Sequence, residues 1–91
     1  MYGASKMDRI FKALADGSRR KLLDILHKRD GQSLGALCEH LTMSRQAVTK
    51  HLVVLESAEL VATEWRGREK IHHLNHTPIR EITRRWITKY S

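Results

Sequence analysis

Residues 33–60 read SLGALCEHLTMSRQAVTKHLVVLESAEL and contain two apolar patterns separated by a short polar break. Ser44 directly follows this break, where its hydroxyl can accept a hydrogen bond from the free N–H groups of a second helix. In each pattern the apolar residues recur with the spacing of one helical face: Leu34, Leu37 and Leu41, then Val48, Leu52 and Leu55. A short helix, a tight turn and a longer capped helix predict a helix-turn-helix, whose second helix commonly enters the major groove of DNA.

Two further helices are predicted before this motif. Residues 1–6 are expected to be disordered. A break at residues 16–18 separates the first helix from the second, which covers about residues 19–28 and which Asp16 or Ser18 is available to cap. The first helix spans about residues 7–15, because its apolar residues recur on one face: Met7, Ile10, Phe11 and Leu14.

A hairpin and a last helix are predicted after the motif. Residues 60–65 and 69–74 are rich in β-branched residues or alternate in polarity, and a turn signal separates them, which predicts a two-stranded hairpin. Thr77 and Pro78 suit the N-cap and the first position of a final helix over residues 78–90. The order helix, helix, helix-turn-helix, hairpin, helix indicates a mainly α fold with a β-hairpin: a winged helix-turn-helix with the element order α-α-α-α-β-β-α.

The composition bounds the size and the partners of this fold. A chain of 91 residues makes one small domain, residues 1–91, which buries only about 60–65% of its unfolded surface, so that a dimer interface would add stability. Lys and Arg outnumber Asp and Glu by 17 to 10, and the net charge is +7. This excess suits a polyanion such as DNA, RNA or an anionic membrane surface, although a generic basic domain would show it too.

The sequence argues against several other classes of protein. No run approaches the about 20 apolar residues of a membrane span, and no leader pattern is present. Cys38 is the single cysteine, so no internal disulfide framework is expected. We therefore expect a reducing, cytoplasmic setting. Neither an enzyme nor a cofactor is expected, because the chain lacks paired carboxylates, a phosphate-binding glycine loop and a nucleophile–base motif.

Five stretches resemble the ArsR-type (arsenical resistance repressor) winged-helix transcriptional regulators. The resemblance extends over nearly the whole chain, from about residue 7 to residue 90, and residues 44–55 are its most specific part. The stretches are FKALADGSRRKLL at 11–23, LCEHL at 37–41, SRQAVTKHLVVL at 44–55, Leu60-Val61, and the wing turn Arg66-Gly67-Arg68. The resemblance implies a homodimer that pairs through its first and last helices and represses transcription by occupying operator DNA.

The second helix of the motif turns one set of residues away from its buried face. With about 100° per residue, Gln46, Lys50 and Val53 lie roughly opposite that face and Ala47 and Thr49 lie on its flanks. Gln can bond adenine, Thr a base edge or phosphate, a small apolar side chain the methyl of thymine, and Arg or Lys a phosphate or guanine. The candidate DNA-contact residues of this helix are therefore Ser44, Arg45, Gln46, Ala47, Thr49, Lys50 and His51. The alternative interpretation of this surface is an ordinary solvated helix face. For His51, the alternative is a polar residue at the edge of the core.

Three cations surround the single glycine of the predicted hairpin turn: Arg66, Arg68 and Lys70. Basic arms of this kind contact phosphates or the minor groove in other DNA-binding proteins. We therefore add these three residues to the candidate DNA-contact set, while an ordinary solvated turn stays the alternative.

Apolar stripes on the first and last helices need a surface to pack against, either in this domain or in a partner subunit. Because the resemblance implies pairing through these helices, over about residues 7–15 and 78–90, the stripes become a candidate dimer interface. Its members are Ile10, Phe11, Leu14, Ile79, Ile82, Trp86 and Tyr90. An ordinary monomer core is the alternative.

Cys38 and His40 are the candidate metal ligands, since metal-sensing members of the family carry Cys-x-Cys in the first helix of the motif. However, residues two apart on a helix point about 200° apart, and a closed tetrahedral site needs four donors. The last helix contains no His or Cys, so the inter-subunit site known from other members lacks its ligands. We therefore expect no metal site, with Cys38 a small buried thiol and His40 a surface residue.

Three hypotheses follow from the sequence. The main one is a sequence-specific repressor that binds a palindromic operator as a homodimer. The second is a metal- or thiol-responsive repressor that uses Cys38 and His40. The third is a winged helix that binds protein or RNA, in which Gln46 and Thr49 would be incidental.

Overall fold

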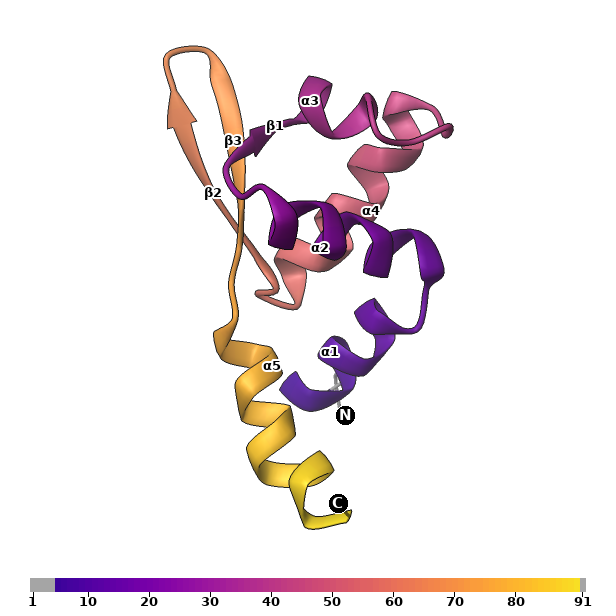
Figure 1. Ribbon diagram of the computed structural model, residues 1–91, viewed down its shortest axis with the longest axis vertical. Coiled ribbons are helices and arrows are strands. Elements are labelled where there is room, and N and C mark those ends of the chain that lie inside the picture. Colours follow the sequence, from indigo (N-terminus) through magenta and orange to yellow (C-terminus); the bar gives the residue numbers. More distant parts are fainter. Residues whose placement is uncertain (1–4, 91) are drawn as a thin grey trace.

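Five helices and a small antiparallel sheet make up the computed structural model, which describes residues 5–90 (Figure 1). The elements are α1 (Lys6–Leu14), α2 (Gly17–Lys28), β1 (Gln32–Ser33), α3 (Leu34–Cys38), α4 (Arg45–Ser57), β2 (Val61–Arg66), β3 (Glu69–Leu74) and α5 (Thr77–Ile82). A π-helical turn (Thr83–Ile87) and a 3-10 turn (Thr88–Tyr90) continue α5. This architecture confirms the predicted winged helix-turn-helix, and it adds the two-residue strand β1, which the sequence pattern did not indicate.

Side-chain caps set the start of each helix in the N-terminal half. The Asp16 carboxylate accepts hydrogen bonds from the N–H groups of Ser18 and Arg19, at 2.8 and 3.1 Å, and so begins α2 at Gly17. The hydroxyl of Ser33 accepts from the N–H of Ala36 at 3.2 Å to begin α3. Similarly, Ser44 accepts from Ala47 at 3.1 Å, and its predicted role as the N-cap of the second motif helix is confirmed.

The N-terminal boundary of the fold differs from the prediction. Residues 1–6 were expected to be disordered, but this is wrong for Ser5 and Lys6. The hydroxyl of Ser5 accepts a hydrogen bond from the N–H of Asp8 at 3.1 Å, so the helix begins at Lys6. Residues 1–4 lie outside the described residues.

The C-terminal helix is less regular than predicted. It begins at Thr77 rather than being capped by it, since the Asn75 side chain accepts the N–H of Thr77 at 3.3 Å. The α-helical pattern ends at Ile82, and the chain continues first in the wider π-helical turn and then in the tighter 3-10 turn that ends at Tyr90. The hydroxyl of Thr83 donates to the carbonyl of Ile79 at 2.9 Å and competes for an oxygen that the helix itself uses, which is a known cause of helix distortion.

The sheet has the order β1-β3-β2, with both pairings antiparallel. Gly31 adopts a φ of 74°, which turns the chain from α2 into β1 and suits glycine. The hydrophobic core lies among α1, α2, α3, α4, the base of the hairpin and the end of α5. Its buried residues are Ile10, Ala13, Leu22, Leu23, Leu26, Leu37, Val48, Leu52, Leu55, Ala58, Leu60, Val61 and Ile82. The hairpin tip and the C-terminal segment lie at opposite ends of the molecule (Figure 1).

We expect Leu55→Ala to lower the free energy of unfolding by about 2–5 kcal/mol, because Leu55 is fully buried and its removal leaves a cavity. Urea denaturation followed by circular dichroism, at one fixed protein concentration, measures the change. Val53→Ala is the matched control on the same helix, since the Val53 side chain is 55% exposed and its loss should change stability by no more than about 0.5 kcal/mol. Equal effects of the two variants would contradict the assigned orientation of α4.

Candidate nucleic-acid interface

One face of α4 is buried and the opposite one is open to solvent. Val48, Leu52 and Leu55 lie in the core. The exposed face carries Arg45, Gln46, Thr49, Lys50 and Val53. An open depression is lined by Leu34 of α3 together with four of these residues, Arg45, Gln46, Thr49 and Lys50. The fold thus gathers most of the predicted contact residues of this helix on one accessible surface.

Three of the predicted contact residues of α4 are also engaged in holding the helix. The Ser44 hydroxyl accepts the N–H of Ala47, and Ala47 itself is half-buried. The Thr49 hydroxyl donates to the carbonyl of Arg45 at 2.9 Å, which leaves its oxygen lone pairs for another donor. These hydrogen bonds lie within α4 and its cap, so they stabilise the helix that carries the exposed face.

His51 lies apart from this face. Its Nδ1 is 3.4 Å from a guanidinium nitrogen of Arg19, and the same guanidinium group donates to the carbonyls of Ala13 and Lys12 at 2.8 and 2.9 Å. His51 therefore occupies a half-buried junction of α1, α2 and α4. This geometry supports the alternative interpretation of His51 as a polar residue at the edge of the core, and we leave it out of the proposed contact set.

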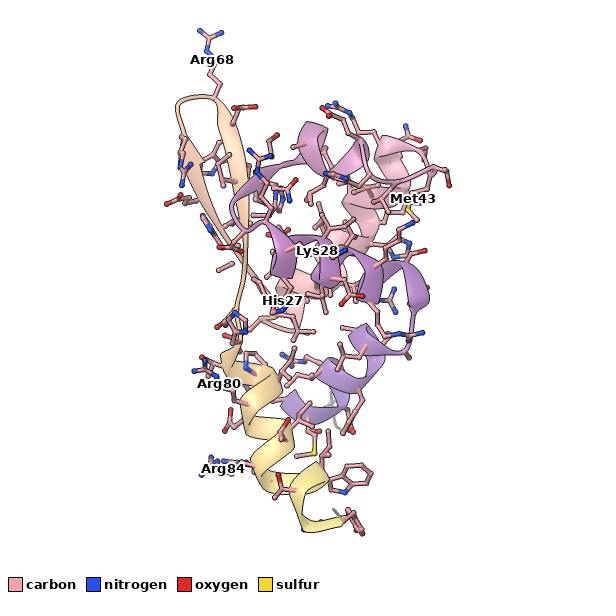
Figure 2. All side chains as sticks on the ribbon, viewed as in Figure 1. His27, Lys28, Met43, Arg68, Arg80 and Arg84 are labelled. Atoms are coloured by element: carbon pink, nitrogen blue, oxygen red, sulfur yellow. The ribbon has the colours of Figure 1, made fainter. Side chains whose placement is uncertain are left out.

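The hairpin forms the predicted wing, and its three cations differ in their surroundings. Gly67 turns the chain with a φ of 62°, and Arg68 projects outward from the tip (Figure 2). Arg66 instead forms an ion pair with Glu64 at 2.8 Å on its own strand. Lys70 forms an ion pair with Glu56 near the end of α4, at 3.1 Å, and this pair connects the wing to α4.

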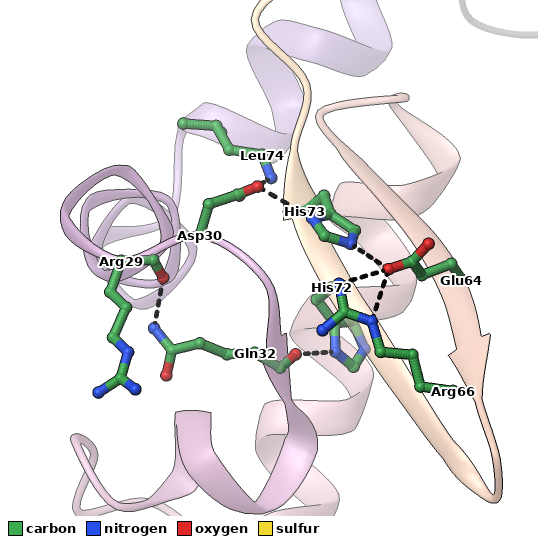
Figure 3. A network of polar contacts seen from close by, with 8 residues as sticks. All are labelled: Arg29, Asp30, Gln32, Glu64, Arg66, His72, His73 and Leu74. Carbon is green, nitrogen blue, oxygen red and sulfur yellow. Dashed lines mark hydrogen bonds and ion pairs between the residues drawn. The ribbon is translucent and has the colours of Figure 1, made fainter.

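A second set of contacts fixes the wing to the turn after α2 (Figure 3). His73 lies between two carboxylates, with Nδ1 2.9 Å from Asp30 and Nε2 3.0 Å from Glu64. The other oxygen of Asp30 accepts the N–H of Leu74 at 2.7 Å. We call Asp30, Glu64 and His73 the wing clamp.

Hydrogen bonds within the wing clamp favour the charged forms of its three side chains. Hydrogen bonds to Asp30 and then to Glu64 raise the pKa of His73 above its ordinary value. The bond from His73, followed by that from Arg66, lowers the pKa of Glu64. Partial burial raises the pKa of Asp30, but hydrogen bonds from Leu74 and His73 outweigh it and hold that pKa below its usual range.

The pairing of β1 with β3 adds a buried polar contact that sequence reasoning missed. His72 and Gln32 are both buried, and His72 Nδ1 lies 2.9 Å from the carbonyl of Gln32. The signal in the sequence was the pair His72-His73, whose side chains point to opposite faces of one strand. A Cβ at Gly31 would lie 3.3 Å from the ring of His73, so glycine also permits the close approach of this turn to the wing.

The predicted dimer residues separate into a buried and an exposed group. Ile10 and Ile82 are each only 3% exposed and belong to the core of the chain itself, which supports the alternative interpretation of these two residues as part of a monomer core. Leu14 is half-buried against the core. The other members remain at the surface together with Ile87, which the prediction omitted: Phe11, Ile79, Trp86 and Tyr90. We call these five residues the C-terminal patch.

Aromatic side chains give the C-terminal patch its shape. The rings of Phe11 and Trp86 meet edge to face with centroids 5.7 Å apart. Trp86 and Tyr90 lie 5.2 Å apart, and the Tyr90 side chain is 71% exposed. An exposed apolar patch of this kind commonly marks a protein–protein interface.

The two candidate metal ligands do not form part of a larger donor group. Cys38 packs half-buried against the core, and His40 is exposed beyond the end of α3. Among residues 5–90, no three His, Cys, Asp or Glu side chains are grouped so that they could hold a metal ion. In the same part of the chain, no helix is long and apolar enough to cross a bilayer.

Comparisons of the sequence with known proteins agree on one class of function. A family model described as a helix-turn-helix domain matches residues 14–64. The chain is 38% identical over 86 residues to the uncharacterized HTH-type transcriptional regulator YuzN of Bacillus subtilis, covering 88% of this chain and 94% of that protein. It is 33% identical over 75 residues to the transcriptional repressor SdpR of the same species, covering 82% of each.

Solved structures share the fold along nearly the whole chain. The crystal structure of an ArsR family transcriptional regulator matches with a TM-score of 0.84 and 26% identity, covering 94% of this chain and 92% of that one. The solution structure of a homodimeric winged helix-turn-helix DNA-binding domain from Mycobacterium bovis matches with a TM-score of 0.75. Its identity is 22%, covering 98% and 90% of the two chains, and at that level the likeness concerns the fold.

The wing clamp predicts a pH dependence of stability. A group whose pKa is raised on folding stabilises the fold fully below its unfolded pKa, 6.5 for His73, and this contribution is lost as the pH rises through the folded pKa. We therefore expect the melting temperature of the protein to decline as the pH rises above about 6.5 and passes through the raised pKa of His73, and His73→Gln to flatten this decline. Thermal denaturation at a series of pH values provides the measurement.

His40→Gln is the matched control for that experiment, because it removes an exposed imidazole outside the wing clamp. Its melting temperature should follow the wild-type profile. If His73→Gln and wild type instead gave parallel profiles, the clamp would not contribute as described.

Proposed function

The chain belongs to the ArsR-type family of winged helix-turn-helix DNA-binding transcriptional regulators, and we propose that it is a repressor that binds palindromic operator DNA as a homodimer. The observation that carries this proposal is the exposed face of α4 beside a wing that carries a projecting cation. A relative 33% identical to this chain is named as a transcriptional repressor, which supports repression. The relatives are named as regulators and not as enzymes.

The chemistry of the exposed surface suits duplex DNA. Gln46 lies on the exposed face of α4, where a side-chain amide can make a bidentate contact with adenine in the major groove. Arg45 and Lys50 flank it and can reach phosphates of the same groove. Arg68 at the wing tip extends the basic surface toward the adjacent minor groove or backbone.

The C-terminal patch supports the homodimer. Its aromatic residues are exposed on the single chain, whereas a small domain gains stability by covering such a surface. The fold is shared with a domain whose solution structure is homodimeric. In a symmetric dimer built on α1 and the segment 77–90, two copies of α4 would meet successive major grooves about 34–36 Å apart.

The remaining sequence hypotheses receive less support. No contact of Cys38 or His40 within residues 5–90 favours a metal- or thiol-responsive repressor. An RNA or protein partner would leave the arrangement of Gln46 and Thr49 on α4 without a purpose. A DNA-binding role agrees with the cytoplasmic setting expected from the single cysteine.

A salt titration tests the proposed contact of the wing tip. We expect Arg68→Ala to weaken binding and to reduce the slope of log K against log salt by about one unit for each phosphate contact that is lost. The probe is a fluorescein-labelled duplex that wild-type protein has selected from a random pool, followed by anisotropy. Arg84→Ala is the matched control, because Arg84 lies on the C-terminal segment at the opposite end of the molecule and should keep the wild-type slope (Figure 2).

If wild-type protein enriched no sequence from the pool, the proposal of a sequence-specific regulator would be overturned. An Arg68→Ala slope equal to that of wild type would remove Arg68 from the contact set.

A second experiment tests the homodimer. Wild-type protein should sediment with twice the mass of the chain, and Trp86→Ala should raise the dimer dissociation constant by at least about thirtyfold, since truncating a buried interface tryptophan commonly costs about 2 kcal/mol or more. Trp65→Ala serves as the control, because it also removes an exposed tryptophan but from the hairpin. A monomeric wild type, or equal effects of the two variants, would contradict the assigned interface.

A further inference from the structure

Trp65 is an exposed tryptophan that the proposed contacts leave unexplained. Its side chain is 69% exposed and lies on β2, whereas the other exposed aromatic residues of the described chain gather in the C-terminal patch. The wing and that patch are at opposite ends of the molecule (Figure 1). A dimer built on the C-terminal patch therefore does not cover Trp65.

The pairing of the hairpin shows which side of the wing Trp65 occupies. Trp65 is directly opposite Lys70 in the register, so both side chains stand on the same face of the sheet. Lys70 binds Glu56 of α4 at 3.1 Å, and the next residue of β3 on that face, His72, is buried. Trp65 thus belongs to the face of the wing that looks toward α4.

Cations border the space between the wing and the helices of the motif. A depression beside the wing is lined by three cations, Arg45 of α4 and Arg68 and Lys70 of the hairpin, by one carboxylate, Glu69, and by residues 33–35 at the start of α3. A neighbouring depression on the α4 side is lined by Thr49, Val53, Glu56 and Lys70, among others. Lys70 and Leu34 line both depressions, and Trp65 is the cross-strand neighbour of Lys70.

We propose that Trp65 is a DNA-contact residue that packs against the sugar–phosphate backbone of the operator, between the base pairs read by α4 and the segment reached by Arg68. The indole face covers the apolar side of a deoxyribose, and its N–H donates to a phosphate oxygen. Contacts to sugar and phosphate position the protein on the duplex. The proposal rests on the function proposed above, because it needs a duplex in contact with α4.

The charge around Trp65 favours a polyanion over a second copy of the chain. Self-association through this face would bring the cations Arg45 and Arg68 of two subunits together, in a protein whose net charge is already +7. A nucleic acid backbone instead pairs with those cations while the indole covers its sugar. Two contacts hold the wing in place for this role: the pair Lys70–Glu56 and the wing clamp.

A contact of this kind has a distinctive signature in a salt titration. Trp65 carries no charge, so losing it weakens binding without releasing fewer counterions, and the salt slope stays that of wild type. Loss of Arg68, in contrast, changes the slope. The two residues of one wing can thus be separated by a single type of measurement.

The experiment uses the full chain and the duplex selected by wild-type protein. Trp65→Thr keeps a β-branched residue in the strand and should raise Kd by about 5- to 150-fold with an unchanged salt slope, a range that corresponds to the loss of one aromatic stacking contact. Trp65→Phe retains the aromatic ring without the N–H group and should give an intermediate Kd. Thr63→Ala, on the same face but farther from the tip, is the matched control and should stay within about twofold of wild type.

Tryptophan fluorescence gives an independent readout. The chain has two tryptophans, Trp65 and Trp86, so the change in emission that wild type shows on adding the duplex should be absent from Trp65→Phe. Melting curves of each variant establish that the protein is folded before titration.

Three outcomes would overturn the proposal. A folded Trp65→Thr variant that binds the duplex like wild type refutes the contact while leaving the proposed regulator intact. A loss of dimer mass in Trp65→Thr would assign the surface to a second copy of the chain. A wild-type protein that selects no duplex would overturn the proposed function and this inference together.

Discussion

The position of the wing relative to α4 is the constraint on which the proposed DNA-contact surface depends. The central strand β3 pairs with β2 on one edge and with β1 on the other, so the hairpin is continuous with the turn that follows α2. Asp30 strengthens this junction by accepting the N–H of Leu74 with one oxygen and contacting His73 with the other. Lys70 adds the pair with Glu56 of α4. Because the wing is attached at both its base and its side, α4 and the wing tip keep a fixed relative position, as the proposed contact with one duplex requires.

Ion pairs within the chain distinguish the basic residues of the wing from one another. The net charge of +7 indicated a polyanionic partner but did not distinguish one cation from another. In the folded chain Arg66 and Lys70 are held by Glu64 and Glu56, whereas Arg68 extends from the tip. An exposed ion pair is weak, so Arg66 and Lys70 still contribute to the positive potential of the wing although each is paired within the chain.

The two ends of the molecule carry separate surfaces, one polar and basic and one aromatic. The first helix and the C-terminal segment each contribute to both the core and the surface. Ile10 and Ile82 are buried in the core, whereas Phe11, Trp86 and Tyr90 remain exposed. The interface that these helices offer is therefore narrower than their full apolar stripes. In the proposed homodimer, this separation would leave α4 and the wing of each subunit open to DNA.

The sequence by itself determined the helix-turn-helix, the hairpin behind it and the exposed face of α4, because apolar periodicity and the cap Ser44 act within a few residues of one another. It did not determine where His51 points, which cations are paired, or that β1 exists. Most of those features depend on contacts between residues far apart in the chain, such as His51 with Arg19, His73 with Asp30 and Lys70 with Glu56, whereas the pair of Arg66 with Glu64 is local to one strand. The same reason explains the stripe residues, since periodicity marks an apolar face but only the packing of α1 against α5 decided which of its members lie in the core.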